Sequence, residues 1–239
     1  MTLLTNLVAY WKLDESSGNA SDSSGGGFTL TNNNTVAYVS AKINNGADFG
    51  TANSNKNLVN TTRTGTVNMD RSISMWIKIN TDLTGGDTYT DVFEWAYGSS
   101  SNFVGYQVGY IRESSVNAFR VNRDRGCVGG ESVKFNGPTA SGGFYHVVMT
   151  VSSNTMSLYV NNSFVSSIAL NTGNGSCNSQ DGFYVGSNRV GSGFSSVTVD
   201  EVGVWSKALT AGEITQLYNS GNGLSYPFTS SNSNFFAFF

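Results

Sequence analysis

The sequence predicts an all-β fold of antiparallel strands with one short helix near the C-terminal end. Three observations predict it. Apolar and polar residues alternate with a period of two in several segments, and only one segment has the period of an amphipathic helix. Charged residues make up 12% of the 239 residues, so the polar surface depends on serine, threonine, asparagine and 28 glycines, which suit strands and turns. We find no repeat or linker, and expect one domain over residues 1–228 and a tail over 229–239.

The strands are expected where this alternation is clearest. Over residues 73–79, isoleucine and methionine occupy one face while Ser74, Trp76 and Lys78 occupy the other. Residues 145–151, 156–160 and 164–168 form a second set, separated by Ser-Ser-Asn-Thr and Asn-Asn-Ser turns. This spacing predicts a three-stranded meander. Further strands are expected over Val104–Arg112, Ala118–Val121, Gly182–Ser187 and Val197–Trp205.

One helix is expected after residue 210. Thr210 and Glu213 have the spacing of a capping box, in which each side chain binds the other residue's backbone N–H. Ile214, Leu217 and Tyr218 then form an apolar stripe, and Gly221 is expected to end the helix in the left-handed conformation.

Charge and hydropathy exclude several classes of partner. The net charge of −3 and the lack of a basic stripe argue against nucleic acid. No segment is apolar over the length that a membrane span needs. The first residues, MTLLTNLVAYWKLDE, show no signal peptide. The low charge is typical of an exported or virion protein, so we expect an extracellular or virion location, reached through a removed leader, by assembly or by lysis.

The two cysteines, Cys127 and Cys177, lie in glycine-rich polar loops where a thiol has little packing role. A disulfide between the two loops is the favoured interpretation, and two free cysteines are the alternative. Two distant cysteines and one histidine do not supply the four ligands of a zinc site.

The C-terminal tail ends in an apolar cluster, Phe235–Phe239, after a Ser/Asn spacer over residues 229–234. Burying each phenylalanine is worth about 1.5–3 kcal/mol, so four of them are costly to leave in water. The tail either folds back on its own domain or inserts into a neighbouring copy in a homo-oligomer or larger assembly, and both alternatives stay open.

Five segments, in order, resemble the laminin-G-like jelly-roll domains of the concanavalin and pentraxin superfamily. They cover Leu7 to about Tyr218. The segments are LVAYWKLDESSG with ASDSSGGG, then GADFG, SISMWIK, GFYHVVMTV with LYVNN, and VDEVGVWSKALTAGEITQLY. The last is the most specific. The resemblance implies a two-sheet antiparallel jelly-roll sandwich.

The same resemblance implies a structural calcium ion between an N-terminal loop and the last strand. Asp22 and Asp200 match the family's ligand positions, and carboxylates on loops suit calcium. The sequence departs from the pattern at Gly50, where the family has aspartate. The alternative is that Asp22 caps a turn and Asp200 binds backbone N–H groups.

The sequence predicts no enzyme. Glycosidases on related folds hold two carboxylates about 5–10 Å apart, often on alternate residues of one strand. No such pattern occurs here, since Asp200 and Glu201 are adjacent and Glu94, Glu113 and Glu131 are far apart in sequence. The single histidine, His146, falls inside a strand, where a structural role is favoured.

The richest supply of sugar-binding side chains lies between residues 91 and 125. Aromatic rings stack on sugar faces, and charged or amide groups bind the hydroxyls. Because strand residues alternate between faces, some of these rings must belong to the core. The candidate ligand-binding residues are Trp95, Tyr97, Tyr106, Arg112, Arg123, Asp124 and Arg125.

Two functions follow as hypotheses. The first is a non-catalytic, lectin-like domain that binds a glycan or a cell-surface protein. The second is a structural protein of a virion or surface layer, such as a capsid decoration or tail-associated protein, that uses the same fold for adhesion. Fold alone does not choose between them.

Overall fold

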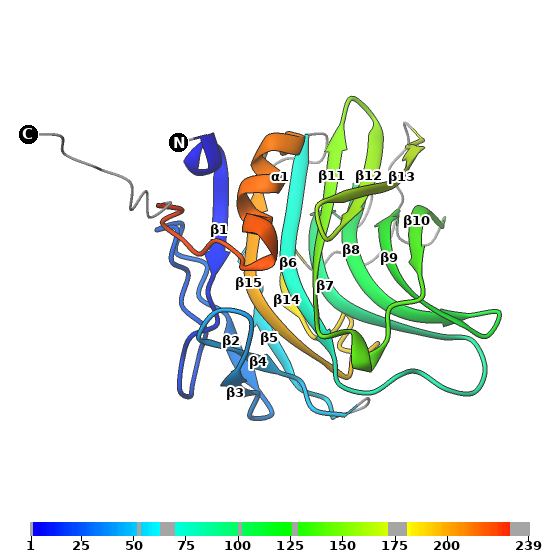
Figure 1. The fold of residues 1–239 in the computed structure, drawn as a ribbon, viewed down its shortest axis with the longest axis horizontal. Coiled ribbons are helices and arrows are strands. Elements are labelled where there is room, and N and C mark those ends of the chain that lie inside the picture. Colours follow the sequence, from blue (N-terminus) through cyan, green and yellow to red (C-terminus); the bar gives the residue numbers. More distant parts are fainter. Residues whose placement is uncertain are drawn as a thin grey trace, which may run out of the picture.

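The molecule is a sandwich of two antiparallel sheets (Figure 1). The computed structural model describes residues 2–51, 54–62, 70–99, 102–125, 129–171 and 181–229, without the side chains of residues 2, 97–99, 102 and 103. Sheet A has the order β13-β12-β11-β6-β15-β4-β3, with β1 also paired to β15. Sheet B has the order β10-β9-β8-β7-β14-β5-β2. These two sheets confirm the predicted jelly-roll sandwich.

The strands of sheet A are β1 Leu7–Trp11, β3 Ala37–Ser40, β4 Asn45–Asp48, β6 Arg71–Ile79, β11 Phe144–Ser152, β12 Thr155–Val160, β13 Ser163–Ala169 and β15 Val197–Trp205. The strands of sheet B are β2 Thr31–Asn33, β5 Asn57–Asn60, β7 Thr88–Ser99, β8 Asn102–Glu113, β9 Val116–Asp124, β10 Gly130–Asn136 and β14 Gly182–Val185. The helices are η1 Thr2–Leu4, η3 Ala140–Gly142, α1 Ala211–Tyr218 and η4 Asn219–Gly221.

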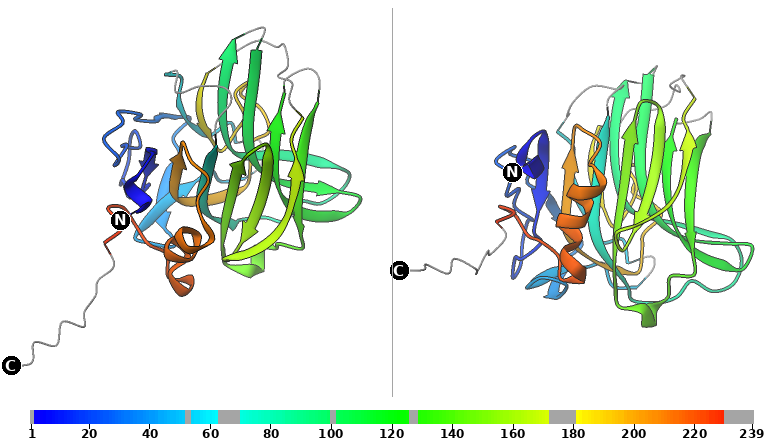
Figure 2. Two further views of the ribbon diagram at one scale, coloured as in Figure 1. Left: turned by 90° about the horizontal axis from the view of Figure 1, so that it is seen from above. Right: turned by 45° about the horizontal axis from the view of Figure 1, so that its top comes forward.

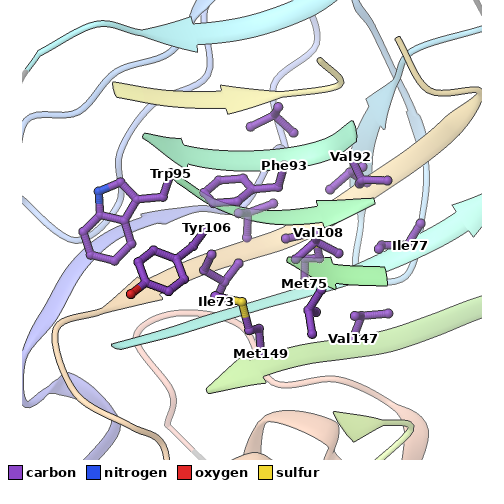
Figure 3. Packing of buried hydrophobic residues seen from close by; sticks show 14 of the residues in the cluster. Ile73, Met75, Ile77, Val92, Phe93, Trp95, Tyr106, Val108, Val147 and Met149 are labelled. Atoms are coloured by element: carbon purple, nitrogen blue, oxygen red, sulfur yellow. The ribbon is translucent and has the colours of Figure 1, made fainter. Parts of the chain in front are cut away.

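The main core lies between the sheets and follows from the alternation of the strands. Ile73, Met75 and Ile77 of β6 are fully buried and face the inner side chains of β7 and β8 (Figure 3). The predicted meander is confirmed, since β11 pairs with β12 and β12 with β13. Burying these side chains supplies most of the folding free energy, at about 25 cal/mol per Å² of apolar surface.

Helix α1 covers the outer face of sheet A (Figures 1 and 2). Its capping box between Thr210 and Glu213 is confirmed. Ile214 and Leu217 pack into a second apolar cluster with Trp205 of β15. The helix ends two residues earlier than predicted, because Asn219 takes the left-handed conformation at the C-cap (φ 47°, ψ 55°). Gly221, the predicted end, lies in the following 3-10 turn.

Within the described part of the chain, no helix has the length and apolar character that crossing a membrane requires.

Strand β15 is the centre of sheet A. It pairs with β6 along one side, and with β4 and then β1 along the other. A bulge between Asp200 and Gly203 marks the change, and Glu201 has φ 52° there. The bulge places both adjacent carboxylates on the outer face of the sheet, where Asp200 lies opposite Trp76 and Glu201 accepts from the Tyr10 hydroxyl, although strict alternation would place them on opposite faces. Asp200 is fully buried there and Glu201 is 3% exposed.

Candidate functional site

Two of the predicted sugar-stacking rings belong to the core. Trp95 of β7 and Tyr106 of β8 are cross-strand partners, and each is only 3% exposed (Figure 3). The buried Arg71 guanidinium lies over both rings, 4.8 Å from the Trp95 centroid and 4.3 Å from that of Tyr106. Arg71 therefore occupies the ring faces that the sequence assigned to a ligand. Alternation predicts this outcome once the inner face of β7 and β8 is known.

Arg112 and Tyr97 lie at opposite ends of sheet B's long hairpin. Arg112 donates to the carbonyls of Leu83 (3.3 Å) and Gly85 (3.0 Å), so it holds the loop between β6 and β7. Tyr97 lies in β7, and its side chain is outside the described set.

The predicted recognition loop, residues 123–125, is tied into ion pairs. Arg123 is 4% exposed and donates to the Asn171 carbonyl at 2.7 Å. Arg123 and Arg125 both approach the Glu131 carboxylate, at 3.7 and 3.3 Å. These bonds give the two arginines a structural task at the end of the sandwich.

Asp124 takes part in a neighbouring cluster that the sequence spacing does not reveal. Arg189 Nη1 lies 2.6 Å from Glu94 Oε1 and 2.7 Å from Asp124 Oδ2. Glu94 and Asp124 are on β7 and β9, with β8 between them, so only the sheet brings them together. Burial raises the pKa of Glu94, and the Arg189 charge opposes that rise. With one guanidinium shared between both carboxylates, and Glu94 fully buried, the pair is not open to act as acid and base.

Asp22 is a turn cap. Its Oδ1 accepts from Tyr10 N (3.0 Å), Ser24 N (2.9 Å) and Ser24 Oγ (2.7 Å), and its Oδ2 accepts from Phe28 N (3.1 Å). The loop closes tightly on β1, because a Cβ on Gly26 would come within 2.5 Å of the Val8 carbonyl. With donors on both oxygens, this aspartate fits the turn-cap alternative rather than a calcium ligand.

Asp200 holds a different turn. Its Oδ2 accepts from Ile43 N at 2.8 Å, and burial raises its pKa to about 8. Among the described residues, no three His, Cys, Asp or Glu side chains gather into a group that could hold a metal ion. The hydrogen bonds of Asp22 and Asp200 agree with the alternative roles of the two residues, and binding of the calcium ion that the resemblance implies stays an untested prediction.

His146 has the structural role that was favoured from the sequence. It is 1% exposed, its Nε2 lies 2.9 Å from Ser74 Oγ, and its ring packs beside the stacked rings of Trp76 and Tyr218. Burial lowers its pKa to about 3, so the ring is neutral at ordinary pH.

Cys127, Cys177 and Phe235–Phe239 lie outside the described residues. The disulfide and the assembly tail stay predictions.

A surface groove, absent from the sequence prediction, lies beside β2 and β3. We name it the asparagine groove. It consists of two adjoining hollows that share Asn32 and Asn34. The first hollow, about 580 Å³, is lined by Asn32, Asn33, Asn34, Asn55, Asn57, Gly191 and Phe194. The second, about 540 Å³, is lined by Ser16, Ser17, Gly18, Asn19, Asn32, Asn34, Thr35, Val36, Ala37 and Tyr38.

The floor of the first hollow follows from strand register. β2 pairs with β5 so that Asn33 lies opposite Asn57, and Asn33 Nδ2 donates to Asn57 Oδ1 at 2.9 Å. Asn57 Nδ2 in turn donates to Ser187 Oγ at 2.9 Å, which ties the floor to the loop after β14. That loop carries Phe194, whose backbone forms a parallel bridge with Asp91 of β7.

The second hollow is held by Asn32 and Tyr38. Asn32 Nδ2 donates to the carbonyls of Gly18 and Val36, both at 2.9 Å, and its Oδ1 accepts from Val36 N at 2.8 Å. Tyr38 donates its hydroxyl to the Gly18 carbonyl at 3.0 Å. The loop over residues 16–19 is therefore fixed against the β2–β3 turn.

The signal for this groove in the sequence is the run Asn32-Asn33-Asn34, with Asn55 and Asn57 further along. A run of asparagines is also typical of turns, so it does not by itself identify a site. Only the β2–β5 register and the loop over residues 188–194 bring the groove together.

Comparison with solved structures shows the same fold in the binding domains of toxins. The binding domain of botulinum neurotoxin DC, in complex with rat synaptotagmin II, is 14% identical with a TM-score of 0.70, covering 91% of this chain and 52% of that one. A second structure is that of botulinum neurotoxin type C, a toxin whose cell entry depends on interaction with two ganglioside molecules. It is 15% identical with a TM-score of 0.69, covering 92% of this chain and 52% of that one.

The binding domain of Paraclostridial Mosquitocidal Protein 1 is 17% identical with a TM-score of 0.65, covering 92% of this chain and 53% of that one. The chain thus spans about half the length of these structures, and at such identities the likeness concerns the fold. Comparison with curated proteins finds no match.

A family model, described as the concanavalin A-like lectin/glucanases superfamily, matches residues 49–215. The match covers more than half of the chain and includes β5 to most of α1. It agrees with the two-sheet topology and with the resemblance carried by the strand motifs. The chain belongs to the concanavalin A-like lectin/glucanase superfamily.

Proposed function

We propose that this chain is a non-catalytic glycan-binding domain and that the asparagine groove holds its ligand. The observation that supports this proposal most is the groove itself, a surface hollow lined mainly by residues with amide and hydroxyl groups. Phe194 is among the lining residues of one part and Tyr38 among those of the other. Such a combination suits a sugar, because rings pack against its apolar face while amides bind its hydroxyls.

The carboxylate geometry supports binding rather than hydrolysis. Glu94 and Asp124 are both held by Arg189, and neither lines the asparagine groove. Glycoside hydrolysis needs two carboxylates on either side of the bond to be cleaved. The neighbouring toxin domains, one bound to synaptotagmin II and one acting with gangliosides, support a binding role for this fold at a cell surface.

The test is a glycan array followed by titration calorimetry on the full chain, with Asn55→Gly as the groove variant. Asn55 has φ 55°, so glycine keeps the backbone while removing the amide. We expect binding about three- to tenfold weaker, the value of one or two hydrogen bonds. Asn154→Gly is the matched control, since Asn154 has φ 63° in the exposed β11–β12 turn. A wild-type chain that holds no glycan on the array would overturn the proposal.

The virion or surface-layer alternative uses the same binding surface and adds assembly through Phe235–Phe239. It stays a prediction, together with the extracellular or virion location. The mass in solution of the full chain and of a chain ending at Phe228, whose side chain is buried in the domain, tests it. An assembly that depends on the tail supports the structural role, and two monomers argue against it.

A further inference from the structure

We infer that the ligand of the asparagine groove is a neutral oligosaccharide, an uncharged glycan segment that crosses both hollows. This inference rests on the proposed function and names its class of ligand. It is carried by the charge of the lining, its free hydrogen-bonding atoms, its rigidity and its length.

The lining excludes anionic sugars. No residue that lines either hollow has a charged side chain. A sialic acid or uronic acid carboxylate would leave water without meeting a cation, which is costly. Arg189, which lies in the loop over residues 188–194, is already bound to Glu94 and Asp124. The lining residues themselves therefore offer none of the charged hydrogen bonds by which carboxylates are recognised.

The free polar atoms match sugar hydroxyls. The Nδ2 atoms of Asn33 and Asn34 are engaged with Asn57 Oδ1 and the Asn55 carbonyl, which leaves their Oδ1 atoms as acceptors. Within the described residues, no hydrogen bond reaches those two oxygens or the Asn55 amide. The groove thus offers acceptors from Asn33 and Asn34, and both a donor and an acceptor from Asn55. A sugar hydroxyl both donates and accepts hydrogen bonds, so the hydroxyls of a sugar can bond to all three asparagine side chains.

The groove is rigid before any ligand arrives. Asn34 and Asn55 both have left-handed backbones (φ 57° and 55°), and Asn34 Nδ2 joins them by a 2.6 Å bond to the Asn55 carbonyl. On the other side, Asp91 N donates to the Gly193 carbonyl at 2.7 Å, and Arg189 anchors the same loop to Glu94. A fixed site loses little conformational entropy on binding, which suits the weak individual bonds of a neutral sugar.

The length of the groove calls for more than one sugar unit. Each hollow alone has a volume within the range of small-molecule sites, about 300–1,000 Å³. Phe194 provides a ring in the first hollow and Tyr38 in the second, while Asn32 and Asn34 form the boundary. A chain that crosses this boundary can place one sugar against each ring.

The first experiment is calorimetric titration of the full chain with malto-, cello- and manno-oligosaccharides of increasing length, and with lactose against sialyllactose. We expect affinity to rise with chain length and then level off, and lactose to bind at least as tightly as sialyllactose. Because no charges meet, affinity should change less than about twofold between low and high salt. Preference for sialyllactose, marked weakening by salt, or affinity independent of length would each overturn the inference.

The second experiment adds the missing charge. Asn55→Lys places a cation beside the first hollow, and we expect it to gain binding to sialyllactose by about fivefold or more relative to wild type, in a salt-dependent way. Asn154→Lys, at the exposed β11–β12 turn, is the matched control and should gain nothing. Equal gains in both variants would show a nonspecific charge effect and contradict the location.

The proposed function and the neutral class of ligand can be tested separately. If the wild-type chain binds no glycan of either charge, the proposed function fails. If it binds anionic glycans in preference to neutral ones, glycan binding stands and only the neutral class is wrong.

Discussion

The buried residues Asp200, Glu201 and His146 have pKa values shifted far from their ordinary ones. Burial raises the pKa of Asp200 to about 8 and that of Glu201 to about 7, and Asp14 adds negative charge near both. Tyr10 donates its hydroxyl to Glu201, which partly opposes the effect of burial. Burial moves His146 in the other direction, to about 3. These residues tie the stability of sheet A to pH.

The carboxylates make the fold less stable as pH rises. In the unfolded chain their pKa values are about 4, so between pH 4 and 8 the folded protein holds protons that the unfolded chain has released. Their contribution is complete below about pH 4 and is lost as pH rises through 7 to 8. We expect Asp200→Asn, which keeps the shape and has no charge, to reduce the loss of unfolding free energy between pH 5 and 9 by at least about 1.4 kcal/mol, the equivalent of one pKa unit.

Urea denaturation at a series of pH values measures this. A variant whose unfolding free energy falls as steeply with pH as that of wild type would contradict the assignment to Asp200.

His146 changes the stability of the fold with pH in the opposite direction, because its folded pKa lies below its unfolded value of about 6.5. Stability from a neutral His146 is present above about pH 6.5 and is lost as pH falls toward 3.

Helix α1 depends on its first turn as well as on its apolar face. Thr210 Oγ1 accepts from Glu213 N at 3.3 Å, and Glu213 Oε2 accepts from Thr210 N at 2.9 Å. We expect Thr210→Ala to lower the unfolding free energy by about 1 kcal/mol, the usual value of such a cap. Chemical denaturation checks it, with Gln216→Ala as the control. Gln216 is exposed in the middle of the same helix, where alanine is the better helix former, so its variant should lose no stability. Equal losses in both variants would argue against a role for the cap.

At the scale of single elements, much of the fold can be predicted from the sequence. Strands β6, β11 and β12 each carry their own alternation, and the capping box of α1 is local. Local signals do not say which face of a strand meets the second sheet. Trp95 and Tyr106 could therefore be proposed as ligand contacts, although they share the inner face with Phe93 and Val108.

The asparagine groove could not be predicted from the sequence, because distant parts of the chain form it. Asn33 and Asn57 are 24 residues apart and meet only through the β2–β5 register. Ser187, which completes the floor, lies 130 residues beyond Asn57. The ion pair of Arg189 with Glu94 likewise joins segments 95 residues apart. A local sequence pattern does not predict contacts between residues so far apart in the chain.

For the whole molecule, the structure and the family resemblance give different expectations about calcium. The resemblance implies an ion that joins Asp22 and Asp200, whereas donors already occupy both Asp22 oxygens and Asp200 holds another turn. We expect the thermal unfolding midpoint to stay unchanged within about 1 °C when millimolar calcium or a chelator is added. An ion that does not bind the folded state cannot stabilise it. A rise of several degrees with calcium, reversed by chelator, would show that the loops rearrange to form a site.

The place of β15 in sheet A has a consequence for how the chain folds. This strand, residues 197–205, lies between β6 on one side and β4 and β1 on the other. Each of these partners precedes it by more than 100 residues. On a ribosome, β1, β4 and β6 would emerge early and wait, unable to join one another, until β15 follows. Closing such long loops is slow, so we expect folding after synthesis of most of the chain, with the early strands exposed to chaperones in the interval.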